Sequence, residues 1–164
     1  MKNPLTRILL LVSGGLLLAV GCATLLQPHA FFAANGIALG NDPSELSEVR
    51  APGGLLIGCA LAILLGAVRA SSTQTALILA TMVYGLFGGS RLISIALDGL
   101  PSNPLIWAMA TELIIGAMCL LALSCFVRRQ AISRQLDASS RSGTARTEIQ
   151  APVDLSERRN HGPV

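Results

Sequence analysis

Four long apolar runs constrain this chain more than any other feature of its sequence. They cover about residues 8–26, 51–69, 75–97 and 105–127, and within them the charged residues are Arg69, Arg91 and Glu112. Each run approaches the ~20 residues that a helix needs to cross a bilayer, and none alternates like a barrel strand. Four such runs leave almost no polar chain to cover them. The sequence therefore predicts an all-α integral membrane protein, a four-transmembrane-helix bundle in contact with the lipid bilayer.

Composition and charge exclude several other classes. Hydrophobic residues make up 52% and charged residues 13% of the chain, which is about half the charge of a soluble domain. The formal net charge of +3 comes from residues 128–164, which hold seven Arg against four acids, whereas residues 1–127 hold five of each sign. The four-helix part therefore has no basic face for a nucleic acid, and we expect no nucleic-acid partner.

The ends of the runs predict the topology and the domain organisation. Basic residues lie near the N-terminus, in the 69–74 connection and just after the fourth run. The charged residues of segments 27–50 and 98–104, in contrast, are mainly acidic. By the positive-inside rule both termini are then cytoplasmic. Residues 128–164, which have no aromatic residue, are expected to form a disordered basic cytoplasmic tail outside a domain of residues 1–127, with at most one interfacial turn near residues 131–136.

The first run also has some features of a signal peptide. Lys2 and Arg7 precede it, and Cys22 follows a small residue as in a lipoprotein cleavage site. The run continues through Leu26, beyond the cysteine, and it is long for the core of a signal peptide. We therefore expect an uncleaved transmembrane helix.

Segment 27–50 carries local structural signals. Pro28 ends the first helix, and Phe31-Phe32 in the following stretch suggest an interfacial position. Asn35-Gly36 is a turn signal. Residues 42–45, Asp-Pro-Ser-Glu, form a capping-box pattern that starts a short helix, with a kink expected at Pro52 where the second span begins.

Small residues recur at helical spacing and are candidates for helix packing. In lipid, small side chains allow helix backbones to approach closely. We expect these positions mainly within the bundle, although a homo-oligomer or a membrane-protein partner is the alternative. The candidates in the second and third runs are Gly54, Gly58, Ala62, Gly66, Gly85 and Gly89.

Charges within the spans form the candidate functional site. Arg91 and Glu112 reach nearly the same depth in an antiparallel hairpin of the third and fourth runs, and Asp98 lies two helical turns beyond Arg91. Arg50 enters at the same end of the second run. A charge near the centre of a span is costly, so Glu112 must be paired, protonated or in contact with a wet cavity. Two interpretations stay open: a buried ion-pair network that fixes helix register, and a ligand or proton site.

Several of these residues resemble a known family. The segment 48–54 (EVRAPGG), the segment 91–101 from Arg91 to Asp98-Gly-Leu-Pro, and Glu112 resemble a domain-of-unknown-function family of small bacterial membrane proteins related to the DoxX-like group. The resemblance covers roughly residues 5–127. It implies a multi-pass protein of the bacterial inner membrane with shared positions Arg50, Arg91, Asp98 and Glu112, and it names no substrate.

Other chemistry has little support in the sequence. The four cysteines form no Cys-x-x-Cys pair, and the two histidines are far apart, so we expect no metal site and no cofactor. Catalysis would have to use the charge cluster, and the sequence favours a protein that is not an enzyme. Two functions remain. The favoured one is a structural or accessory membrane subunit. The alternative is a binding protein for a small amphiphile or anion, such as a lipid headgroup, a quinone or an organic acid, held between the helices.

Overall fold

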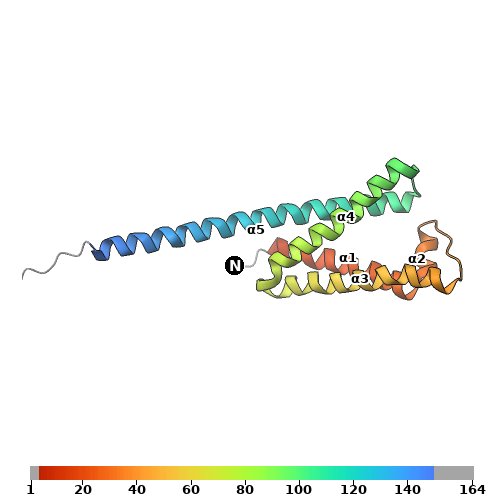
Figure 1. Ribbon diagram of the computed structural model, residues 1–164, viewed down its shortest axis with the longest axis horizontal. Coiled ribbons are helices and arrows are strands. Elements are labelled where there is room, and N and C mark those ends of the chain that lie inside the picture. The colour runs from red at the N-terminus through yellow and green to blue at the C-terminus, as the bar shows by residue number, and fades with distance from the viewer. Residues whose placement is uncertain (1–3, 150–164) are drawn as a thin grey trace, which may run out of the picture. The chain divides into compact units, whose positions relative to one another are not determined.

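The computed structural model describes residues 4–149, and these residues form helices and short connections without any strand. Figure 1 shows the order of the elements along the chain. They are α1 (Pro4–Leu26), α2 (Pro28–Ala34), α3 (Pro43–Val68), the 3₁₀ turn η1 (Ala70–Ser72), α4 (Thr73–Asp98) and α5 (Asn103–Ile149). Four of these helices contain a stretch long and apolar enough to cross a membrane. The prediction of an all-helical chain with four long apolar helices is confirmed.

Helix α5 does not end at residue 127, where the sequence predicted that it would. It continues to Ile149, so residues 128–149 are helical and the expectation of a disordered tail is wrong for them. Residues 150–164 of that tail lie outside the described residues. An existing helix extends without a new nucleation step, and the Ala, Arg and Gln residues of this segment favour helix. The chain divides into two compact units, Met1–Phe126 and Val127–Val164. The first of these is called the four-helix unit below, after its four long helices.

Helix α3 begins earlier than its apolar run. The side chain of Asp42 accepts hydrogen bonds from the backbone N–H groups of Ser44 (2.8 Å) and Glu45 (3.3 Å), and Pro43 occupies the first turn. The predicted N-cap is thus confirmed. The short helix expected here is continuous with the second span, and Pro52 lies inside α3. The side chain of Glu45 accepts a hydrogen bond from Gly40 N, so it stabilises the preceding loop.

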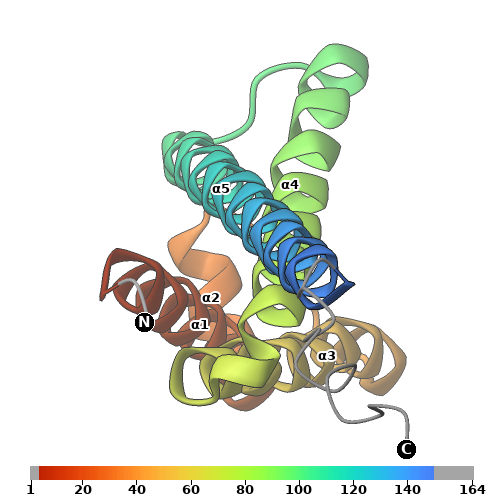
Figure 2. The ribbon, with the colours of Figure 1, turned by 90° about the vertical axis from the view of Figure 1, so that its left-hand side faces the viewer.

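Helices α1 and α3 lie side by side and antiparallel, and they make the most extensive helix contact in the four-helix unit (Figures 1 and 2). Two glycines allow their backbones to approach. A Cβ atom on Gly53 would lie 3.0 Å from Leu25 N, and a Cβ atom on Gly21 would lie 3.0 Å from Gly53 O. Helix α4 packs on α3, and the hydroxyl of the buried Tyr84 donates to the carbonyl oxygen of Ser13 in α1 at 2.5 Å.

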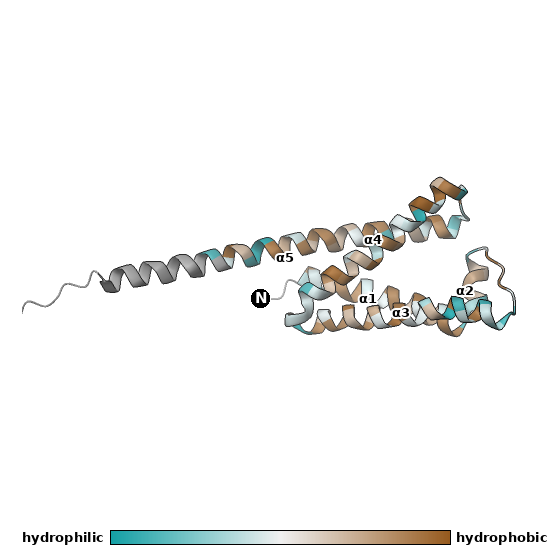
Figure 3. Cartoon of the chain, in the orientation of Figure 1, coloured by the Kyte–Doolittle hydropathy of each residue, from teal (hydrophilic) through white to brown (hydrophobic). Residues whose placement is uncertain are grey.

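The core is narrow, and apolar side chains also cover the outside of the unit. Leu10, Ile63 and Leu77 are fully buried, whereas Leu55 is 70% and Leu61 is 56% exposed. Figure 3 shows apolar residues along the long helices and hydrophilic residues near several of their ends. An apolar outer surface of this kind is what lipid contact requires.

Of the small residues that the sequence predicted for helix packing, Gly66 and Gly85 take part in close helix contacts. Cβ atoms placed on Gly54, Gly58, Gly85 and Gly89 would meet no neighbour within 4 Å, and Ala62 is exposed. For Gly54, Gly58, Ala62 and Gly89 the structure shows no close helix contact. The backbone of Gly85 does face α5, because a Cβ atom on Gly116 would lie 3.2 Å from Gly85 N. Because lipid is as apolar as the core, a repeat of small residues does not show which face of a helix is inside. Apart from Gly66 and Gly85, which were expected, the helix glycines in close contact are Gly14, Gly21, Gly53, Gly88 and Gly116.

Candidate functional site

The four-helix unit contains a pocket of about 570 Å³ between its helices. This volume lies within the range of about 300–1,000 Å³ that is typical of small-molecule sites. The lining comes from α1, α2, α3, α4 and α5 and from the segment that follows α2, and most of it is apolar. The apolar, non-aromatic side chains of the lining are Leu16, Leu17, Val20, Ile37, Val49, Pro52, Leu56, Val83, Leu105 and Ala108.

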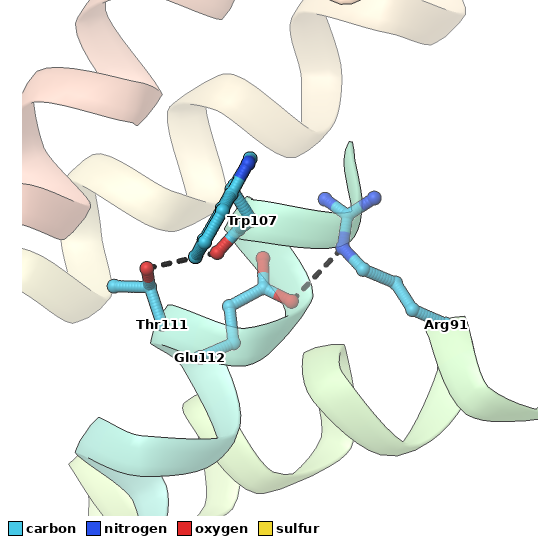
Figure 4. Close-up of polar contacts among 4 residues, drawn as sticks. All are labelled: Arg91, Trp107, Thr111 and Glu112. Carbon is cyan, nitrogen blue, oxygen red and sulfur yellow. Dashed lines mark hydrogen bonds and ion pairs between the residues drawn. The ribbon is translucent and has the colours of Figure 1, made fainter. Parts of the chain in front are cut away.

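An ion pair between α4 and α5 forms part of the pocket wall. Arg91 Nε donates to Glu112 Oε2 at 2.9 Å, and the two side chains are 32% and 17% exposed. The tight connection at Gly99, which has a positive φ of 93°, turns the chain from α4 into α5 and so allows this contact. In Figure 4 the two terminal nitrogens of Arg91 point away from Glu112. Arg91 therefore contacts Glu112 through Nε alone, which leaves donor groups of the guanidinium group available for a further partner.

Most other polar groups of the lining have partners inside the protein. Tyr84 donates to Ser13 O, Thr24 donates to Val20 O at 2.9 Å, and Thr111 donates to Trp107 O at 2.9 Å (Figure 4). The side-chain amide of Asn35 donates to Phe31 O at 2.7 Å. These bonds make the walls less polar than the residue names suggest, so the strong polar groups of the pocket are its charged side chains.

Two loop contacts hold α2 at one end of the pocket. Ser102, in the connection between α4 and α5, donates its hydroxyl hydrogen to Asn35 O at 2.7 Å. A ring nitrogen of His29 lies 3.1 Å from Gly40 O. Gly36, with a φ of 79°, makes the turn predicted after α2. The aromatic residues of α2 are thus positioned by hydrogen bonds at both of its ends.

The predicted charge cluster is only partly brought together. Arg91 and Glu112 form the ion pair, whereas Arg50 and Asp98 do not line the pocket. Arg50 is exposed on α3, and Asp98 accepts a hydrogen bond from Ser94, one turn earlier on α4, at 3.1 Å.

Sequence reasoning missed the aromatic part of the site. Four of the six aromatic side chains of the chain line this pocket: Phe31, Phe32, Tyr84 and Phe87. Phe31 and Phe32 pack edge to face, with ring centroids 5.6 Å apart and an angle of 80° between the rings. The sequence did offer a signal for this part of the site. Because the chain has few aromatic residues, the position of each ring could have been examined as a candidate for the site.

A comparison with protein families identifies the domain. The family described as a domain of unknown function, DUF4345, matches residues 5–123. The chain belongs to the DUF4345 family. No curated protein and no solved structure matches it. All residues that line the pocket lie within the DUF4345 domain, so the pocket belongs to the family domain and not to the segment after it.

The lining of the DUF4345 pocket is mostly apolar. Its lining includes no histidine, cysteine or lysine among the residues that the structure describes. Within the same described part of the chain, no three His, Cys, Asp or Glu side chains are placed to bind a metal ion. The lining combines a large apolar surface with a small number of charged groups, as is common in sites for small molecules.

Proposed function

We propose that this DUF4345 protein binds a small amphiphile in the pocket between its helices. The observation that supports the proposal is the pocket of about 570 Å³ with charged groups in a mostly apolar wall. An amphiphile would place its apolar part against the leucine and valine side chains and its polar head at the charged side chains of the lining.

The cavity favours this function over a purely structural role for the ion pair. The pocket is partly open and lined mostly by apolar side chains, so an amphiphile can enter it and cover them. An ion pair that only fixed the register of α4 and α5 would need no cavity beside it. The amphiphile hypothesis therefore accounts for both the pair and the space, and the structural hypothesis accounts for the pair alone.

We also propose a location for the protein. Basic residues lie at the N-terminus, in the 69–74 connection and just after the fourth apolar run. This distribution supports a multi-pass protein of the bacterial inner membrane with both termini in the cytoplasm. A relation to DoxX-like four-helix proteins fits the same architecture. Reporter fusions at Gly40 and Ser139 should then lie in opposite compartments, and the same compartment for both would refute this topology.

The experiment that tests amphiphile binding uses a variant that fills the pocket. Ala108 lines the pocket on α5, whereas Ala117 is exposed on the same helix. Protein purified in lipid nanodiscs is analysed by native mass spectrometry for molecules that remain bound after activation. We expect a bound amphiphile in the wild type and in Ala117→Trp, and its loss in Ala108→Trp. An equal bound population in the two variants would contradict the proposal.

A role as a structural or accessory membrane subunit is the second candidate. The observation that favours it is the open face of α3, where Gly54, Gly58 and Ala62 have no close neighbour within the four-helix unit. A second copy or another membrane helix could approach closely there. Cysteine cross-linking at position 58 in native membranes tests this role, since a specific cross-linked product is expected for a subunit and none for a free-standing protein.

A further inference from the structure

The charges of the pocket lining do not balance. It contains one cationic side chain, Arg91, and two carboxylates, Glu112 and Glu48. Arg91 and Glu112 neutralise each other through their contact at 2.9 Å. Within the part of the chain that the structure describes, the side chain of Glu48 has no hydrogen bond or ion pair, and Glu48 is exposed at the pocket. The net charge of the lining is therefore negative when both carboxylates are ionised.

Aromatic rings of a neighbouring helix line the same pocket as Glu48. Glu48 lies on α3, and Phe31 and Phe32 lie on α2, which packs against α3. The ion pair, in contrast, comes from α4 and α5. The perpendicular arrangement of the two rings offers a ring face and a ring edge in neighbouring positions. Ring faces attract cations, and alkylated ammonium groups in particular bind among aromatic side chains.

These observations point away from an anionic ligand. An anion at the free terminal nitrogens of Arg91 would meet a charge that Glu112 already offsets, and it would be repelled by both carboxylates. A cation beside Glu48 would meet a carboxylate that has no other partner among the described residues, together with aromatic faces.

We propose that the pocket selects amphiphiles whose polar head is an alkylated ammonium group, held by Glu48 and the rings of Phe31 and Phe32. The inference rests on the proposed function, because it names the class of ligand for the same pocket. The apolar part of the ligand lies along Leu17, Leu56 and the other aliphatic side chains of the lining. A free cationic amphiphile and the headgroup of an ethanolamine or choline lipid share this chemistry.

Three probes with the same ten-carbon chain test the charge preference: decyltrimethylammonium, decanol and decanoate. Each is titrated into the full-length protein in phosphatidylglycerol nanodiscs, whose lipids carry no ammonium group, and empty nanodiscs provide the background. We expect decyltrimethylammonium to bind at least about tenfold more tightly than either other probe. Addition of phosphatidylethanolamine or phosphatidylcholine to the nanodiscs then identifies the source. Competition with the probe indicates a lipid headgroup, and no competition indicates a free amphiphile.

Variants with matched controls locate the selectivity. Glu48→Gln should weaken binding of decyltrimethylammonium about tenfold and leave decanol binding unchanged. Glu45→Gln, one turn earlier on α3 and outside the pocket lining, is the control and should change neither. Phe32→Leu keeps an apolar side chain but removes the ring, so it should weaken binding of the cation about three- to tenfold and have little effect on decanol.

The possible results separate this inference from the function on which it rests. If decanol or decanoate binds as tightly as the cation, or if Glu48→Gln behaves like Glu45→Gln, the ammonium preference is wrong and the amphiphile pocket stands. If none of the three probes binds above the background of empty nanodiscs, and Ala108→Trp also leaves the natively bound population unchanged, both proposals are wrong.

Discussion

Replacement of neighbouring glycines in α3 by alanine tests the helix packing directly. Gly53 and Gly54 are adjacent in sequence but lie in different environments. A Cβ atom on Gly53 would lie 3.0 Å from Leu25 N, 3.1 Å from Gly21 O and 3.3 Å from Leu25 Cα, whereas one on Gly54 would meet nothing within 4 Å. Because all three neighbours of Gly53 are backbone atoms of α1, no side-chain rotation can make room for a methyl group.

The contact distances set the expected magnitude. Ordinary van der Waals contacts of a Cβ atom begin near 3.4 Å, so Gly53→Ala requires α1 and α3 to separate by about 0.4 Å. Overpacking of this kind costs about 1–3 kcal/mol. Alanine in place of glycine favours the helix by about 0.5–1 kcal/mol at both positions. Gly54→Ala should therefore be neutral or stabilising, and the two variants should differ by about 1–3 kcal/mol in their free energy of unfolding.

Unfolding by titration with SDS in mixed micelles, followed by circular dichroism, measures this difference. Gly88→Ala provides an intermediate case, because its new methyl group would meet mainly the side chain of Leu113, which can move. We expect a smaller loss for Gly88→Ala than for Gly53→Ala. Equal free energies of unfolding for Gly53→Ala and Gly54→Ala would refute the α1–α3 contact described above.

Three further predictions concern the ion pair, the start of α3 and the end of the family domain. Glu112→Gln and Arg91→Leu should each lower the free energy of unfolding by about 1–3 kcal/mol, and the double variant should recover much of this loss; additive losses would show that the two are not partners. Hydrogen bonds from the N–H groups of Ser44 and Glu45 lower the pKa of Asp42 below its ordinary value of 3.8. The cap is therefore stabilising above about pH 4, and protection of the Ser44 amide from hydrogen exchange should fall as the pH drops below that value. In Asp42→Ala this protection should be lost at every pH. Truncation after Arg129 should leave membrane insertion and the helicity of the four-helix unit intact, as judged by membrane fractionation and circular dichroism.

The helices and their local signals could be predicted from the sequence because their causes are local. The length of each apolar run sets the number of long helices. The cap at Asp42 and the turn at Gly36 depend on a few adjacent residues and appear where the sequence placed them. The prediction of where α5 ends was wrong. The polar composition after residue 127 predicted disorder, whereas the chain there continues a helix that has already formed.

The site could be predicted in part. The depths of Arg91 and Glu112 in a hairpin follow from counting residues, and their contact is compatible with that count. Nothing in the count places Arg50 or Asp98 outside the pocket, because a residue's depth does not give the direction of its side chain. The rings of Phe31 and Phe32 suggested a membrane interface from their sequence position, and the structure places them in the lining of the pocket.

The sequence by itself determined that this is an all-helical protein with four helices suited to a membrane. The tertiary structure decided which face of each helix is inside, and so which glycines meet a neighbouring backbone and which side chains surround the cavity. In a soluble protein the polar and apolar faces of a helix would have shown this in advance. A helix in lipid is apolar on both its inner and its outer face, so hydrophobicity fixes its length but not its rotation, and contact with the other helices fixes the rotation.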